Sequence, residues 1–130
     1  MSATQIPEDL SYTRSHEWVK MDGNVATIGI TAYAQGELGD IVFVEVPEAG
    51  AAVRGDEPFG TIEAVKTVAD LIAPASGQVV ETNPALADHP ELVNSDPYGA
   101  GWMIRLRLDG AAGPAGLLSA SEYRQLLEAA

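Results

Sequence analysis

The sequence has no cysteine and almost no lysine, with Lys20 and Lys66 as the only two. The lack of cysteine excludes disulfides, thiolate metal ligands and cysteine nucleophiles, so any sulfur chemistry must come from an attached group. Lysine and arginine together number 7 against 19 aspartates and glutamates, which gives a formal net charge of −12. Such a charge repels nucleic acid phosphates and anionic lipid surfaces. We therefore expect proteins or small molecules as partners, with no nucleic acid and no membrane.

Long apolar runs and targeting signals are also missing. No apolar stretch approaches the ~20 residues that cross a bilayer. The opening "MSATQIPEDL" has neither the basic and apolar order of a secretion signal nor the arginine-rich character of a transit peptide. These absences predict a cytoplasmic protein, or a mitochondrial matrix protein whose presequence has been removed. We expect one domain over residues 1–130, with its core at about 12–110, a C-terminal helix at about 119–129, and a monomeric state.

Short strands separated by turn signals dominate the pattern. Asp22-Gly23 predicts a tight hairpin turn, and the strand after it places alternate apolar residues on one face. In "GDIVFVEV" apolar residues occupy both sets of alternating positions, with Ile41 and Phe43 opposite the valines, which predicts a strand covered on both sides for part of its length. "PFGTIEAV" and "VADLIAP" flank Lys66 and predict a hairpin with the lysine at its turn. "SGQVVETN" and "WMIRLRL" are two further expected strands.

Helices are expected to be short. Thr31 is placed to cap a helix over "TAYAQGEL", and Pro84 is placed to open a helical segment over "PALAD". "NSDPYGAG" is expected to be a loop. Ser119 and Glu122 have the spacing of a capping box at the start of the tail "SASEYRQLLEA", which predicts the C-terminal helix.

Lys66 has unusual neighbours for a surface lysine. It is flanked by small apolar residues, whereas a turn built only for solvation favours glycine, asparagine, aspartate or proline. A Schiff-base lysine needs burial or a cationic neighbour to release its proton, but the nearest charges in sequence are Glu63 and Asp70. The pattern therefore favours an attachment point over a nucleophile. A simple solvating charge is the alternative.

Several separated motifs resemble the glycine cleavage system H protein family. They are "YTRSHEWV", "VATIGITAYAQGELGDIVFVEVPEAG", "IEAVKTVADLIAPASGQVVETNPAL" and "PELVNSDPYGAGWMIRLRL", and they occur in the family's order from about Tyr12 to the C-terminal helix. The resemblance implies a mostly β fold, the barrel-sandwich hybrid of lipoyl and biotinyl domains, with short helices and a C-terminal helix. It also implies a modified lysine at a hairpin tip.

The resemblance further implies a non-catalytic carrier whose Lys66 bears lipoate in amide linkage. Such a carrier takes an aminomethyl group from the pyridoxal-phosphate glycine decarboxylase and delivers it to the aminomethyltransferase, which uses tetrahydrofolate. Dihydrolipoamide dehydrogenase then reoxidises the arm. Lipoylating enzymes are implied as partners that install the arm.

Two groups of site residues follow from the resemblance. "EAVKTVAD" matches the family's Glu-Ser-Val-Lys pattern with Ala64 where serine is usual, so Glu63 lies in the segment that the lipoylating enzyme recognises. In the family the loaded arm folds back into a cleft. Ser15, Glu17 and Asp70 match positions in that cleft, and Glu37 lies where some members carry histidine.

The physical chemistry of the cargo supports a cleft of this kind. An aminomethyl group on sulfur is prone to hydrolysis, which exclusion of water slows. Its amine is protonated, so Glu17 or Asp70 is suited to hold it by charge-assisted hydrogen bonds. For both acids, and for His16 and His89, an ordinary surface or packing role is the alternative.

Other lysine carriers fit less well. A biotin carrier usually has methionines beside its lysine, where this chain has Val65 and Thr67. The lipoyl domain of a 2-oxoacid dehydrogenase acyltransferase is shorter and usually has Asp-Lys-Ala at the tip. An H-like lipoate carrier that serves sulfur oxidation or lipoyl relay remains an alternative, because its fold and lysine would be unchanged. A self-sufficient Schiff-base enzyme has no support in the residues.

Overall fold

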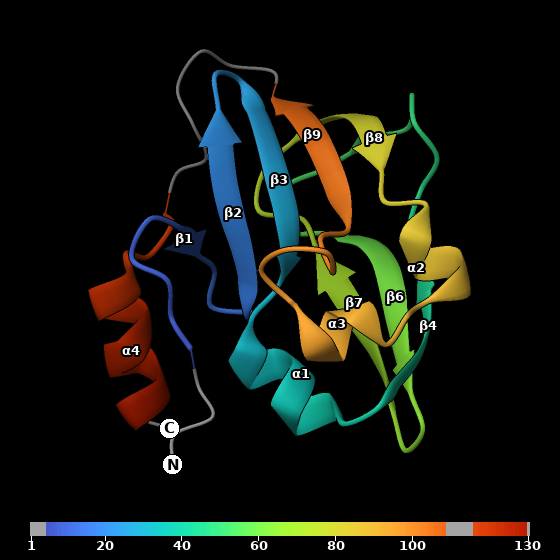
Figure 1. Cartoon of the computed structure of the whole chain (residues 1–130). Coiled ribbons are helices and arrows are strands. Elements are labelled where there is room, and N and C mark those ends of the chain that lie inside the picture. The colour runs from blue at the N-terminus through green and yellow to red at the C-terminus, as the bar shows by residue number, and fades with distance from the viewer. Residues whose placement is uncertain (1–4, 109–115, 130) are drawn as a thin grey trace.

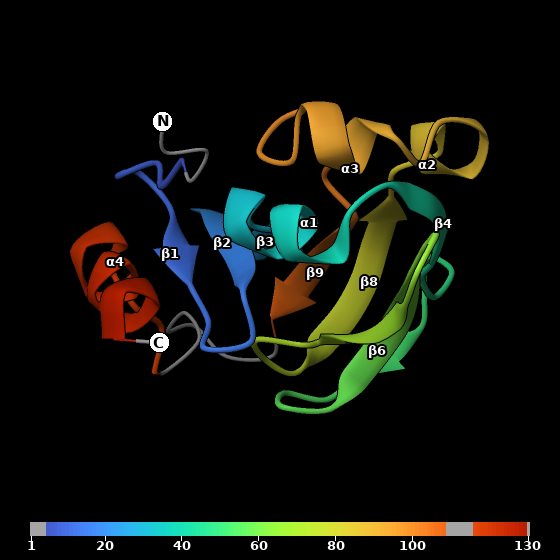
Figure 2. The same ribbon diagram turned by 90° about the horizontal axis from the view of Figure 1, so that it is seen from below.

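The computed structural model describes residues 5–108 and 116–129. Two antiparallel sheets face each other (Figures 1 and 2). The six-stranded sheet has the order β1 (Ser11–Tyr12), β2 (Glu17–Asp22), β3 (Val25–Ile30), β9 (Ile104–Leu108), β8 (Gly77–Thr82) and β5 (Ala52–Val53). The three-stranded sheet has the order β4 (Ile41–Glu45), β6 (Pro58–Ala64) and β7 (Val68–Ile72). The expectation of a mostly β chain is confirmed.

Alternating apolar residues of the two sheets form the main core. The expected apolar face of β3 is buried, as Ile28 illustrates, and so is the apolar face of β9, which includes Ile104. They pack with Ile62 of β6 and Leu71 of β7, which come from the other sheet. Burial of these side chains is the main favourable term that holds the two sheets together.

The first hairpin forms as predicted, but its turn is one residue later than expected. Asp22 pairs with Val25, so the two loop residues are Gly23 and Asn24. Gly23 has a φ of 64°, which glycine adopts without steric cost. A glycine at the first loop position is the requirement of a type II′ turn.

The expectation that β4 is covered on both sides for part of its length is wrong. Phe43 is 51% exposed and Val42 is exposed as well. The reason is a register shift between Ile41 and Phe43, where a β-bulge adds one residue. Beyond the bulge the alternation is reversed, so Ile41 and Val44 lie opposite the buried residues Ala64 and Ile62.

Four helices connect or flank the strands of the described part. They are α1 (Ala32–Leu38), α2 (Ala85–Asp88), α3 (Leu92–Ser95) and α4 (Ala120–Ala129). Thr31 caps α1 as predicted, because its side chain accepts a hydrogen bond from Ala34 N. The α3 turn lies partly within the segment expected to be a loop, because four residues are too few to show a helical period.

The C-terminal helix α4 forms with its predicted capping box. Ser119 N donates to Glu122 Oε1 at 2.9 Å and Glu122 N donates to Ser119 Oγ at 3.1 Å. The helix packs on β1 and β2 through a second apolar cluster in which the rings of Tyr12 and Tyr123 stack with centroids 4.7 Å apart. Figure 1 shows α4 beside β1, at the far side of the molecule from β4.

The expected domain limits at residues 1 and 130, and the expected core limit near 110, lie outside the described residues. Within the described ranges, every helix is too short or too polar to cross a membrane.

Candidate functional site

Lys66 lies in the turn between β6 and β7, as the sequence predicts. Figure 1 shows the hairpin that these two strands form. The turn is closed by Ala64 N, which donates to Thr67 O at 2.7 Å. Val65 N donates to Asp40 O at 3.0 Å, so the tip is also joined to the connection between α1 and β4. Lys66 itself is exposed. The lysine is therefore displayed to solvent on a rigid support.

The stem of Lys66 lies close to Gly39, the residue that ends α1. A Cβ atom at Gly39 would lie 3.4 Å from Lys66 Cε, and the φ of 85° at Gly39 also favours glycine. Asn94 of α3 holds this connection in place: its Nδ2 donates to Gly39 O at 2.8 Å and its Oδ1 accepts from Ile41 N at 2.9 Å. Asn94 was not identified from the sequence, because its partners are more than 50 residues away.

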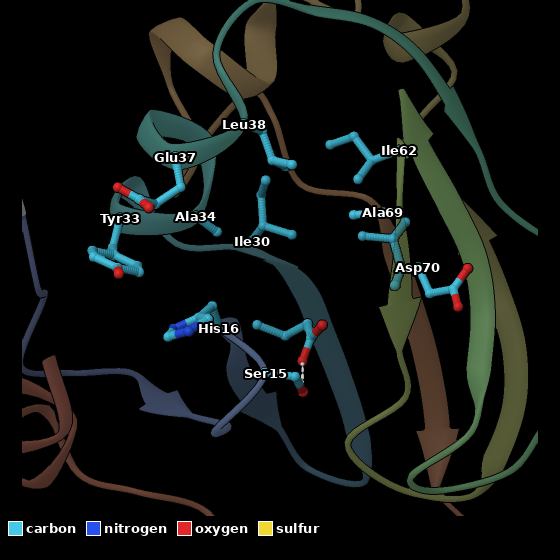
Figure 3. A pocket seen from close by; sticks show the side chains of 12 residues that line it. Ser15, His16, Ile30, Tyr33, Ala34, Glu37, Leu38, Ile62, Ala69 and Asp70 are labelled. Atoms are coloured by element: carbon cyan, nitrogen blue, oxygen red, sulfur yellow. Dashed lines mark hydrogen bonds between the residues drawn. The ribbon is translucent and has the colours of Figure 1, made fainter. Parts of the chain in front are cut away.

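A cleft of about 310 Å³ lies beside this hairpin (Figure 3). The segment Ser15–Glu17 forms one wall, α1 forms a second, and β6 and β7 form the third. Ile30, Leu38 and Ile62 contribute apolar surface, and most of the lining is apolar. The cleft thus offers an apolar chamber with polar groups at its walls and rim.

Glu17 is the polar centre of the cleft and is only 2% exposed. Its Oε1 accepts hydrogen bonds from Thr13 Oγ1 at 2.6 Å and from Ser15 Oγ at 2.7 Å. Its Oε2 accepts from Ile72 N at 3.2 Å, which ties it to β7 of the other sheet. Burial raises the pKa of Glu17, and these hydrogen bonds oppose that shift only in part. Ser15 and Glu17 are therefore brought together, and Glu17 is not a surface acid.

The other predicted acids lie at the edges of the site. Asp70 lines the cleft from β7, but its carboxylate is exposed and points away from Ile62 and Ala69 (Figure 3). Glu37 of α1 also lines the cleft and is exposed. Glu63 is exposed on β6, opposite Val68.

A hydrogen-bonded chain links the cleft to α4, and sequence reasoning did not find it. The Tyr123 hydroxyl lies 2.8 Å from His16 Nδ1 and 2.8 Å from Thr31 Oγ1. His16 and α1 both line the cleft, so one buried hydroxyl joins two of its walls. His16 has a φ of 73°, a strained conformation that its neighbours must impose. Burial lowers the pKa of His16, and Glu37 partly opposes this.

We expect Tyr123→Phe to loosen these two walls. The ring stack with Tyr12 remains and Thr31 Oγ1 still accepts from Ala34 N, but His16 Nδ1 loses its hydroxyl partner, and an unsatisfied buried group costs about 1–3 kcal/mol. Urea denaturation should show this loss, and hydrogen exchange should quicken at Ala34 N. Tyr33→Phe is the matched control, because the Tyr33 hydroxyl has no hydrogen-bond partner among the described residues. Equal stability of the two variants would contradict the assignment.

Two facing sheets, a lysine at a hairpin tip and a cleft beside it define a carrier domain of the lipoyl and biotinyl class. The model of the family described as Glycine cleavage H-protein matches residues 10–130. The chain belongs to this family. It is 56% identical over 124 residues to the glycine cleavage system H protein of Rubrobacter xylanophilus, with 95% of this chain and 96% of the relative covered.

Further relatives agree in sequence and in structure. The glycine cleavage system H protein of Chlorobium limicola is 55% identical over 124 residues, with 94% of this chain and 97% of the relative covered. The crystal structure of a glycine cleavage system H protein from Mycobacterium marinum matches with a TM-score of 0.88 and 44% identity, and covers 95% of this chain and 99% of that chain. The predicted family and the barrel-sandwich fold are thereby confirmed.

Proposed function

We propose that this chain is a lipoyl carrier of the glycine cleavage system, with the lipoyl group in amide linkage to Lys66. The observation that carries the proposal is an exposed lysine at a hairpin tip beside a cleft that contains a buried carboxylate. Family membership over residues 10–130 supports it. The chain has no cysteine, and the lipoyl group supplies the reversible disulfide chemistry that the chain lacks.

The cleft fits an arm of this kind that bears a protonated amine. The apolar side chains of Ile30, Leu38 and Ile62 provide a surface for the hydrocarbon and the sulfur atoms of the arm. Glu17 provides the acceptor for the amine, and Ser15 and Thr13 hold its carboxylate in one orientation. Walls on three sides keep water from the aminomethyl carbon, which slows loss of the cargo.

The chain's own residues bind, orient and shelter the cargo, whereas its partners perform the catalysis. We infer that glycine decarboxylase loads the arm, aminomethyltransferase unloads it and dihydrolipoamide dehydrogenase reoxidises it. Lipoylating enzymes recognise Glu63 beside Lys66, and Asp70 contacts the arm at the rim. We further infer that the chain acts as a single cytoplasmic domain and as a monomer, and we assign no nucleic acid or membrane partner.

The proposal is tested in two steps with the whole chain. Incubation with lipoate, ATP and a lipoylating enzyme should raise the intact mass by one lipoyl group. The lipoylated protein should then support exchange of the glycine carboxyl carbon with labelled bicarbonate by glycine decarboxylase. The absence of any mass shift would disprove the carrier function. A lipoylated protein that fails with a competent decarboxylase would instead favour a carrier for another lipoate-dependent pathway.

A further inference from the structure

The side of the three-stranded sheet that faces away from the core is unusually apolar around Lys66. Six large hydrophobic side chains are exposed among the described residues, and four belong to this sheet or to the lysine turn. They are Val42, Phe43, Val65 and Val68, with Val65 75% exposed and Val68 62% exposed. Because these side chains are exposed, no described element covers this face (Figures 1 and 2).

The strand register places these residues in one continuous row. Phe43 of β4 pairs with Glu63 of β6, and Glu63 pairs with Val68 of β7. Residues directly opposite each other on paired strands share a face of the sheet. Phe43, Glu63 and Val68 therefore lie side by side, with Val42 and Val65 next to them. We call these five residues the outer face.

The bulge in β4 is what turns Phe43 outward. Regular alternation from Ile41 would direct Phe43 into the core, but the register shift places it opposite the exposed Glu63. Bulges are often found next to functional sites, where they redirect a side chain. An exposed apolar cluster with charged neighbours marks a surface that another molecule covers. The remaining exposed hydrophobics, Met21 and Val80, belong to the other sheet.

The charges on these strands have one sign. Strands β4, β6 and β7 contain Glu45, Glu63 and Asp70 and no lysine or arginine. Lys66 is the only lysine or arginine of the sequence between positions 55 and 104. Acylation of Lys66 removes that single positive charge. The bare carrier and the lipoylated carrier therefore present different charge patterns at the same place.

We propose that the outer face is the docking surface for the enzyme that loads the arm, which contacts it through an apolar mouth rimmed by lysine and arginine. This rests on the proposed function of Lys66. A cationic rim is attracted by the three carboxylates and repelled by a bare Lys66. The partner thus distinguishes lipoylated carriers from bare ones by charge, before the arm enters its active site. A lipoylating enzyme also meets Glu63, but it binds Lys66 while the positive charge is still present and so cannot use this discrimination.

The apolar part of the proposal is tested by the bicarbonate exchange assay with lipoylated variants. Phe43→Ser should raise the KM for the carrier about tenfold, and Val68→Ser should raise it several-fold, with kcat unchanged. Truncation of an apolar side chain in an interface typically weakens binding by a factor of this size. Val80→Ser is the matched control for Val68→Ser, since Val80 is an exposed valine of the other sheet. Its KM should stay at the wild-type value.

The charge part is tested with unlipoylated proteins as competitive inhibitors of the same assay. Lys66→Gln mimics the lost charge without carrying an arm, and it should inhibit roughly two- to fivefold better than bare wild-type protein. The difference should shrink as salt is added, because exposed charges are screened.

Different results overturn different claims. If wild-type lipoylated protein fails to support exchange, the proposed function fails first. If it supports exchange but Phe43→Ser and Val68→Ser keep the wild-type KM, the docking proposal alone is wrong. If Phe43→Ser and Val68→Ser raise the KM of the lipoylating enzyme but not that of the decarboxylase, the outer face belongs to the lipoylating enzyme. This result would also overturn the docking proposal. If Lys66→Gln and bare wild-type protein inhibit equally, the claim that the partner distinguishes the two carriers by charge is wrong.

Discussion

Lys66→Arg is expected to abolish lipoylation and bicarbonate exchange completely. An arginine keeps the positive charge, but its delocalised guanidinium stays protonated and does not form an amide with an activated carboxylate. Lys66 is exposed, so the exchange of one cationic side chain for another leaves the core unchanged. Intact mass and the exchange rate are the measurements, with a denaturation curve to confirm that the variant is folded.

Lys20→Arg is the control for this experiment, because Lys20 is the only other lysine. Lys20 is exposed on β2, in the other sheet. This variant should be lipoylated and active at the wild-type level. A lipoyl group found on Lys20, or residual lipoylation of Lys66→Arg, would contradict the assignment of the attachment site.

Glu17→Gln is expected to make the loaded arm lose its aminomethyl group about ten to a hundred times faster. This factor corresponds to the loss of a hydrogen bond to a charged group, which contributes about 1.5–3 kcal/mol. Glutamine has nearly the same shape, and its oxygen can accept from Ile72 N while its amide donates to the hydroxyls of Thr13 and Ser15. The cleft is therefore preserved and only the charge is lost. Release of formaldehyde and ammonia from the isolated loaded protein measures the rate.

Glu37→Gln is the matched control for cargo retention, because Glu37 lines the same cleft but is exposed. Water screens an exposed carboxylate, so this variant should lose cargo at a rate within about twofold of wild type. If Glu17→Gln and Glu37→Gln lost cargo equally fast, the buried carboxylate would not be the group that holds the amine.

The same Glu17→Gln variant should also change how stability depends on pH. Because burial raises the pKa of Glu17 in the folded protein, the unfolded chain releases this proton at a lower pH than the native protein does. Wild-type protein therefore loses stability as the pH rises through the native pKa of Glu17, and the glutamine variant does not. The free energy of unfolding of Glu17→Gln relative to wild type should rise as the pH increases from the ordinary pKa of a glutamate to the raised native pKa of Glu17. If the free energy of unfolding of Glu17→Gln relative to wild type fell instead, the site would stabilise the charged form of Glu17.

Local features were predictable because their signals lie within a few residues of each other. Three local features formed where the sequence predicts them: the capping box of Ser119 and Glu122, the cap at Thr31, and the hairpin around Lys66. The hairpin turn at Gly23 was one residue off, since neighbouring turn residues give equivalent signals. The α3 turn was missed because a single helical turn has no period to detect.

The sequence by itself determined that any sulfur chemistry must come from an attached group, that Lys66 lies at an exposed hairpin turn, and which face of β3 is apolar. These follow from composition and from patterns two to four residues long. Only the tertiary structure decided that Glu17 is buried against Ile72, that Tyr123 joins His16 to Thr31, and that a bulge turns Phe43 outward. Each of these depends on strand register or on contacts between distant segments. The physical reason is that burial and register are set by how the whole chain packs, and no short stretch of sequence records them.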